Sequence, residues 1–141
     1  MTFFDSKVSK FSINDTADLP RDLSAYLTEV RGLPGPRLLN EVTALGDSGA
    51  KFIPGLEDVT VNLRGLFDDT ATTGPDAVLG PLRTNTTALS FEYGPEGSAV
   101  GDVKYSGTCW VSLYELRSRV GNLVEWVATL QVEGSVTRGA Y

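Results

Sequence analysis

The chain has 141 residues, 41% of them hydrophobic and 21% charged, which is typical of a globular protein, and we expect one domain over residues 1–141. Its formal net charge of −6 gives no general attraction to nucleic acid or to an anionic membrane. It has no histidine and one cysteine, Cys109, which excludes the commonest general base, an intrachain disulfide and a thiolate metal cage.

Strand patterns dominate the chain, and in order they fall near 7–14, 25–32, 37–43, 59–67, 87–93, 103–118 and 124–136. The alternation of apolar and polar side chains is clearest over 59–67, 103–118 and 124–136, as in half-buried strands. The turn sequence at 120–122 predicts that the last two form a long hairpin. Within 103–118 the alternation predicts one apolar face carrying Cys109, Val111 and Leu113.

One helix is predicted, over 72–83. Thr73 followed by Asp76 resembles a capping box, and Pro75 suits the first helical turn. The pair Gly80-Pro81 should shorten or bend this helix. The sequence therefore predicts a mainly β fold with one short helix. It contains no run of about 20 apolar residues, the length that would predict a membrane span.

The connection at about 44–57 is unusual for a loop, because it carries Phe52, Ile53 and Leu56 beside a Pro-Gly pair. These side chains could tuck under the chain's own sheet, or they could reach a neighbouring subunit. A structureless connection of more than about a dozen residues is usually functional, which favours the second interpretation.

Few residues suggest chemistry. Asp68, Asp69 and Asp76 could ligate a hard cation, but their spacing is not that of an EF-hand, and a strand end followed by a helix start explains them better. Cys109 is predicted to be a buried structural thiol. Trp110 departs from the alternation, either as an exposed anchor or to meet the helix or another subunit. An enzyme without histidine would need a carboxylate pair, and none is marked out, so we predict no catalytic residue, metal site or cofactor.

Five segments spread over residues 20–139 carry a family resemblance. They are RDLSAYLTEV, LLNEVTALGDSGAKFIPGLEDVTVNLRGLFDDT, GPDAVLGPLR, SFEYGPEGSAVGDVKYSG and LQVEGSVTRG. In this order they resemble the major tail tube proteins of long-tailed, siphovirus-type bacteriophages. The Gly80-Pro81 pair departs from the smoother helix of that family and puts the length of the helix in doubt.

The resemblance implies an antiparallel β-sandwich or barrel-like tail-tube fold with one short flanking α-helix and a long inter-subunit loop. It implies a structural virion protein, assembled in the host cytoplasm into stacked hexameric rings that form the tail tube. Double-stranded DNA would pass through the lumen during ejection without sequence-specific binding. The implied partners are the chain itself and the tape measure, tail terminator and distal tail proteins. Two alternatives are a monomeric β-sandwich module of a virion that binds a receptor or carbohydrate, and the tube of a contractile tail or type VI-like injection system.

Such a tube would use two sets of residues. The expected inter-subunit contacts are Lys51, Phe52, Ile53, Pro54 and Leu56. The expected lumen-facing residues are Thr60, Asn62, Ser106, Thr108, Glu125, Thr129, Gln131 and Glu133, which share the polar parity of their strands. An acidic or small polar lumen would let DNA slide, because each Lys or Arg on a phosphate adds salt-dependent affinity.

Overall fold

The computed structural model describes residues 1–141 and confirms a mainly β, antiparallel fold. The strands are β1 (Lys10–Asn14), β2 (Pro20–Asp22), β3 (Leu27–Arg31), β4 (Arg37–Glu41), β5 (Phe52–Glu57), β6 (Thr60–Leu66), β7 (Leu89–Gly94), β8 (Val103–Arg117) and β9 (Glu125–Ala140). The helical elements are the 3₁₀ turns η1 (Ser6–Val8) and η2 (Ser24–Tyr26) and the α-helix α1 (Pro75–Leu82). Strands β2 and β5 were not predicted from the sequence.

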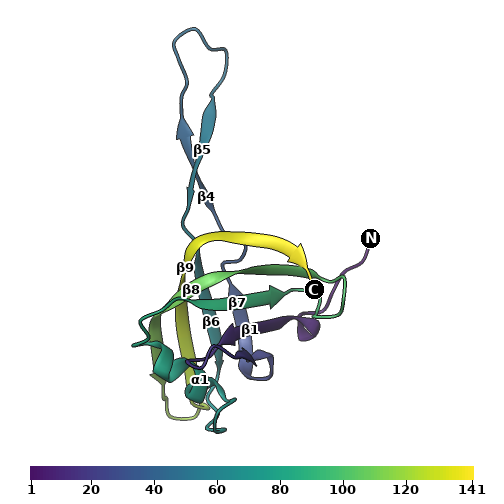
Figure 1. The fold of residues 1–141 in the computed structure, drawn as a ribbon, viewed down its shortest axis with the longest axis vertical. Coiled ribbons are helices and arrows are strands. Elements are labelled where there is room, and N and C mark those ends of the chain that lie inside the picture. Colours follow the sequence, from purple (N-terminus) through teal and green to yellow (C-terminus); the bar gives the residue numbers. More distant parts are fainter.

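Seven strands form one antiparallel sheet in the order β2-β1-β7-β8-β9-β6-β3. This sheet folds over on itself, because the long strands β8 and β9 bend and their two halves belong to two layers (Figure 1). Near one end β8 pairs with β7, and near the other end β9 pairs with β6. The other two strands, β4 and β5, form a separate hairpin that projects from the body (Figure 1).

Two register shifts interrupt the β8–β9 hairpin. The first puts extra residues in β9, between Glu133 and Thr137, and the second is a β-bulge in β8, between Val111 and Leu113. A bulge bends its strand and raises the local twist, which suits strands that must cross from one layer to the other. The second bulge also reverses the parity of the later residues of β8. Leu113 therefore pairs with Thr129 and is exposed, whereas Tyr114 pairs with Ala128. The prediction that Leu113 shares the apolar face of Cys109 and Val111 is wrong.

A core of 17 buried apolar residues fills the space between the layers. On one side Phe11 and Phe91 stack with ring centroids 6.2 Å apart, from the neighbouring strands β1 and β7. On the other side Trp126 is fully buried, and its indole N–H donates to the carbonyl of Leu66 at 3.0 Å. That hydrogen bond satisfies the one polar atom that burial of the indole would otherwise leave without a partner.

Helix α1 closes one side of the core with Val78, Leu79 and Leu82. It begins later than predicted, at Pro75, and the residue before it, Gly74, makes no side-chain cap hydrogen bond. The predicted capping box at Thr73 is therefore wrong. Pro81 lies within the last turn, and the helix ends one residue later, in line with the expected shortening.

Gly65 sits where the sheet has no room for a side chain. A Cβ there would lie 2.1 Å from the carbonyl oxygen of Tyr26 and 2.6 Å from the ring of Trp126. We expect Gly65→Ala to lower the free energy of unfolding by about 3 kcal/mol, since backbone and a fully packed indole must both move. Urea unfolding followed by tryptophan fluorescence measures this loss.

Gly139 provides the matched control, because it also lies in a strand but a Cβ there meets nothing within 4 Å. Gly139→Ala should change the free energy of unfolding by no more than about 0.5 kcal/mol. Equal effects of the two substitutions would contradict the packing argument at Gly65.

Candidate functional site

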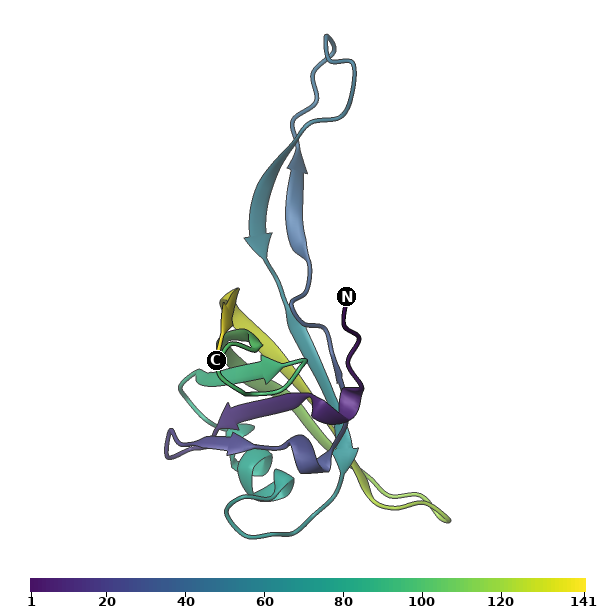
Figure 2. The same ribbon diagram turned by 90° about the vertical axis from the view of Figure 1, so that its right-hand side faces the viewer.

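The β4–β5 hairpin and its tip, residues 37–57, are called the arm. The arm projects from the body along the long axis of the molecule (Figure 2). The prediction of a loop at about 44–57 is corrected here, because Phe52–Glu57 is a strand that pairs antiparallel with Arg37–Glu41. Only the tip, 42–51, lies between the two strands.

Local hydrogen bonds order the tip of the arm. The backbone N–H of Val42 donates to the Lys51 carbonyl at 2.8 Å, and the Lys51 N–H donates to the hydroxyl of Thr43 at 2.9 Å. The Lys51 ammonium lies 2.8 Å from a carboxylate oxygen of Asp47. This partner, with a backbone N–H of Ala44, holds the pKa of Asp47 below its usual value. The tip is thus a formed turn that presents the two strands.

Apolar side chains of the arm are exposed. Phe52 and Ile53 are 52% and 53% exposed and Leu56 is 83% exposed, so they do not tuck under the body. Successive residues of a strand point to opposite faces, so the adjacent pair Phe52 and Ile53 makes both faces of the arm apolar. A two-stranded hairpin with no packed face is marginal alone in water. The apolar side chains of the arm are therefore exposed and available to pack against another protein surface.

The apolar residues of the first arm strand were not among the inter-subunit contacts predicted from the sequence. Leu38, Leu39 and Val42 are about half exposed, and Leu39 pairs with Pro54 across the hairpin. The signal was present in the run PRLLNEV, whose leucines are adjacent instead of alternating. That pattern fits a strand with two apolar faces.

All eight predicted lumen residues lie on one face of the seven-stranded sheet, the face away from the core. In register, Thr60 pairs with Gln131, Asn62 with Thr129, and Thr108 with Glu133. The remaining residues of the set, Ser106 and Glu125, have the same parity within their strands. The side chains that the sequence placed on one face thus share the outward face of the sheet, which is called the polar face below. Because the sheet folds over, this face continues across both layers.

Four cations of the polar face are close to carboxylates, whereas Lys10 of β1, which shares the parity of Ser12 opposite Glu92, forms no ion pair. Strands β3, β6 and β8 place four basic residues there, and each lies within 4.0 Å of an acidic one. The pairs are Arg31–Glu29 at 4.0 Å, Arg64–Glu125 at 3.6 Å, Lys104–Glu92 at 3.7 Å and Arg117–Glu115 at 3.4 Å. Such exposed pairs stabilise the fold little, but each offsets one positive charge. Glu133 adds a carboxylate with no basic partner.

The two aromatic residues of β8 have different surroundings. Trp110 pairs with Gln131 and lies half-buried on the polar face. Tyr114 is the one that meets the helix, because its hydroxyl donates to a carboxylate oxygen of Asp76 at 2.9 Å. Burial, and then that carboxylate, raise the pKa of Tyr114. Of the alternatives for Trp110, contact with the helix is therefore wrong, because Trp110 lies on the opposite face and Tyr114 makes that contact.

The acidic residues singled out in the sequence have structural roles. Asp68 follows β6 and accepts the backbone N–H of Thr70 at 2.8 Å, while Asp76 lies in the first turn of α1. No group of three or more His, Cys, Asp or Glu side chains is arranged to hold a metal ion. Cys109 is buried, which raises the pKa of its thiol to about 12 and keeps it from reacting as a thiolate.

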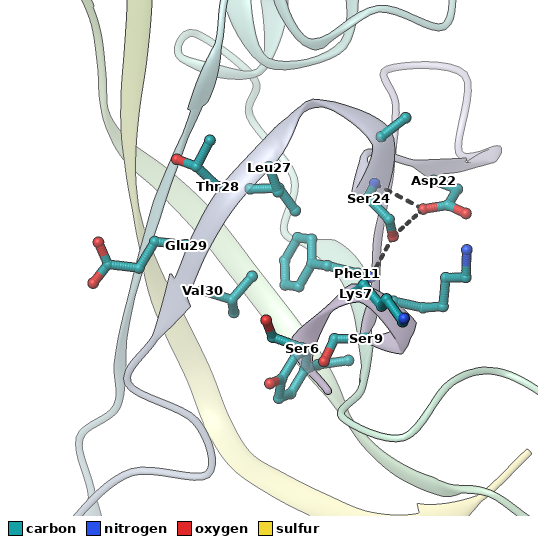
Figure 3. Close-up of a pocket in the computed structure, with 13 residues that line it drawn as sticks. Ser6, Lys7, Ser9, Phe11, Asp22, Ser24, Leu27, Thr28, Glu29 and Val30 are labelled. Carbon is teal, nitrogen blue, oxygen red and sulfur yellow. Dashed lines mark hydrogen bonds between the residues drawn. The ribbon is translucent and has the colours of Figure 1, made fainter. Parts of the chain in front are cut away.

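A cavity of about 640 Å³ lies between the N-terminal turn η1 and strand β3 (Figure 3). Strands β2 and β3 are the two edges of the sheet, so this cavity marks the side where the folded sheet stays open. Ser24 donates its backbone N–H to Asp22 at 2.9 Å and accepts the N–H of Phe11 at 2.9 Å. In Figure 3 the Glu29 carboxylate is turned away from Asp22. These two carboxylates of the cavity therefore do not face one another.

None of the helices is both long and apolar enough to cross a membrane. No family model and no curated protein matches the sequence.

Solved structures match the fold over nearly its whole length. A chain of the native gene transfer agent (GTA) virion aligns with a TM-score of 0.77 at 13% identity, covering 98% of this chain and 100% of that one. The SPP1 tail tube aligns with a TM-score of 0.73 at 12% identity, covering 99% and 80%. A chain of the PVC sheath–tube complex, from an extracellular contractile injection system, aligns with a TM-score of 0.70 at 12% identity, covering 99% and 93%. The chain therefore has the fold of phage-type tail tube proteins.

Proposed function

We propose that this protein is the major subunit of a viral tail tube and assembles into hexameric rings that stack into a hollow conduit for DNA. The observation that carries this proposal is the match to the tail of the empty GTA particle, which has C6 symmetry. It has a TM-score of 0.77 and covers 98% of this chain and all of the other. The match covers nearly the whole of both chains, including an arm that packs on nothing in the monomer. This supports the proposal that the two proteins assemble in the same way.

The arm supplies the contact between subunits in this proposal. Lys51, Phe52, Ile53, Pro54 and Leu56 would meet a neighbouring copy, as expected from the sequence. Burial of apolar area stabilises such a contact by about 25 cal/mol per Å², before the cost of ordering side chains is subtracted. The formed strand β5 lowers that ordering cost, because its backbone is already fixed in the monomer.

The polar face lines the lumen in this proposal. The eight candidate residues, from Thr60 to Glu133, lie on it, and four of its cations already have carboxylate partners. Paired cations offer little to phosphate, so DNA would pass without being held. Glu133, which has no basic partner, would add repulsion on β9.

The protein would act in the virion tail as a structural, non-enzymatic component. Its partners would be further copies of itself, a tape measure protein in the lumen, and terminator and distal tail proteins at the two ends. Structures described as a PVC sheath/tube terminator and as the SPP1 Dit protein share the fold, with TM-scores of 0.71 and 0.53. Terminator and distal tail proteins with a related fold would stack on the two ends of the tube through the same surfaces that join its rings.

A tube from a contractile system is the second candidate, favoured by the PVC sheath–tube match. Such a tube needs an outer wall that binds a sheath. Particles purified from the native source distinguish the two, since only a contractile system carries a second helical layer around the tube.

Electron microscopy of the purified protein tests the main proposal. We expect hollow tubes with six-fold symmetry in negative stain, forming as the protein concentration rises, because repeated weak contacts make assembly cooperative. Size-exclusion chromatography at low concentration should show smaller species. A monomer at every concentration, with no rings or tubes, would contradict the proposal and favour a binding module.

A further inference from the structure

The base of the arm is attached to the body by a side chain as well as by the chain itself. Neither β4 nor β5 pairs with a strand of the seven-stranded sheet. One hydrogen bond joins the arm to the rest of the molecule, from the backbone N–H of Val136 in β9 to Oε2 of Glu57 at 3.1 Å. Glu57 is half-buried and is the last residue of β5, and β9 passes beside the base of the arm (Figure 1).

The donor of this bond is free because β9 departs there from its register with β8. Glu133 pairs with Thr108 and Thr137 pairs with Ser106, so the residues between Glu133 and Thr137 outnumber those opposite them. A backbone N–H in such a bulge has no ladder partner, and a partly buried N–H needs one. Glu57 supplies the acceptor. The side chain of Val136 packs against the core, which fixes the position of its N–H relative to the body.

The segment that enters the arm crosses closely over the start of β6. A Cβ at Gly32 would lie 2.2 Å from the carbonyl oxygen of Thr60, and one at Gly35 would lie 2.7 Å from the side chain of Val59. Val59 belongs to the core, so this crossing fixes the point at which the arm leaves the body. A single point of attachment leaves rotation about that point free. The bond of Glu57 to β9 is a second attachment, and two attachments define a direction.

We infer that Glu57 is a positioning residue, which holds the arm in one direction relative to the body before any contact between subunits forms. A surface that is already held in its binding direction loses less conformational entropy on association. When only a fraction of the molecules has the competent conformation, the apparent affinity falls by that fraction. The consequence for assembly rests on the proposed tube, whereas the direction of the arm is a property of the monomer.

Distances between two spin labels on the monomer test this role. One label is placed at the tip of the arm with Ser48→Cys and the other on the body with Val100→Cys, both exposed sites outside the strands. Cys109 is buried and takes no label. Pulsed electron paramagnetic resonance should give one narrow distance distribution, which Glu57→Ala should broaden. Glu57→Gln keeps an oxygen that can accept the N–H, so its distribution should stay narrow.

Glu96→Ala is the matched control. Oε1 of Glu96 accepts the backbone N–H of Val103 at 2.7 Å, which is the same kind of bond but lies within the body. Its loss should leave the distances between the labels narrow. A Glu57→Ala distribution as narrow as that of the wild type would overturn the inference. Equal broadening by Glu96→Ala would also overturn it, because the arm would then respond to any loss of stability.

Tube assembly gives the second readout. If about one tenth of the Glu57→Ala molecules keep the competent direction, the protein concentration at which tubes appear should rise about tenfold. Glu57→Gln and Glu96→Ala should assemble near the wild-type concentration. A broadened arm with an unchanged threshold would overturn the role of Glu57 in assembly. Wild-type protein that forms no tube would contradict the proposed function, and the distances in the monomer would still decide whether Glu57 directs the arm.

Discussion

Replacing Phe52 and Ile53 together with serine should abolish tube formation and leave the fold of the monomer intact. Both side chains are about half exposed, and they pair with Glu41 and Asn40 in a hairpin outside the core. The substitution therefore removes no core contact. The free energy of unfolding of the monomer should change by no more than about 0.5 kcal/mol, as is typical of surface sites. Assembly loses apolar burial in every subunit, so small losses multiply through the ring. Negative-stain microscopy and sedimentation measure the loss.

Val100→Ser is the matched control for this double variant. It also replaces an exposed apolar residue, but it lies in a turn between β7 and β8 and outside the arm. It should form tubes at the wild-type concentration. Normal tubes from the double variant at Phe52 and Ile53 would show that the arm does not form the contact between subunits. A large fall in its unfolding midpoint would show instead that the hairpin supports the body.

The strands that were predicted best from the sequence have one buried face and one solvent-exposed face. In β6 and β9 the alternation is read directly, because Val61, Leu63, Ala128 and Leu130 must all point into the core. A period of two is then enforced by burial, and the pattern predicts both the strand and its orientation. The polar face results from the same parity, which is why its eight residues could be chosen from the sequence.

Strand β5 was not predicted from the sequence because neither of its faces is buried. Pro54 and Gly55 are unfavourable residues for a strand, and the segment pairs only with β4. With no core to face, its apolar residues need not alternate, so the pattern resembles that of an apolar loop. The bulge before Leu113 had a similar effect, since one inserted residue reverses every side chain after it.

The remaining features depend on contacts that are distant in sequence. The Arg64–Glu125 pair joins β6 to β9, and an apolar groove brings together three segments, which contain Ala25, Phe67 and Leu123. Each segment alone is an ordinary turn or strand end with an apolar residue or two. Only the sheet register and the folding of the sheet reveal that cations and carboxylates of the polar face lie side by side and that these three segments form one apolar groove.

A single charge reversal on the polar face should convert a passive lumen into one that holds DNA. Glu133 is exposed on β9 and has no basic partner, so Glu133→Lys breaks no ion pair and should not disturb the fold. In a six-fold ring it places six lysines around the lumen, and this ring repeats at every level of the tube. Each lysine that contacts a phosphate should steepen the dependence of log K on log salt by about 0.9. Short duplex DNA incubated with assembled tubes should become resistant to nuclease at low salt and be released as salt rises.

Asp69→Lys carries the same change of charge at an exposed site in the connection between β6 and α1, off the polar face. Tubes of this variant can attract DNA to their surface, but that DNA stays accessible to nuclease. The discriminating quantity is therefore the protected fraction, not the total bound. If Glu133→Lys tubes protect no more DNA than Asp69→Lys tubes, the polar face does not line the lumen. The opposite face is then filled by the core, so the conduit would have to run along the sheet edges at β2 and β3.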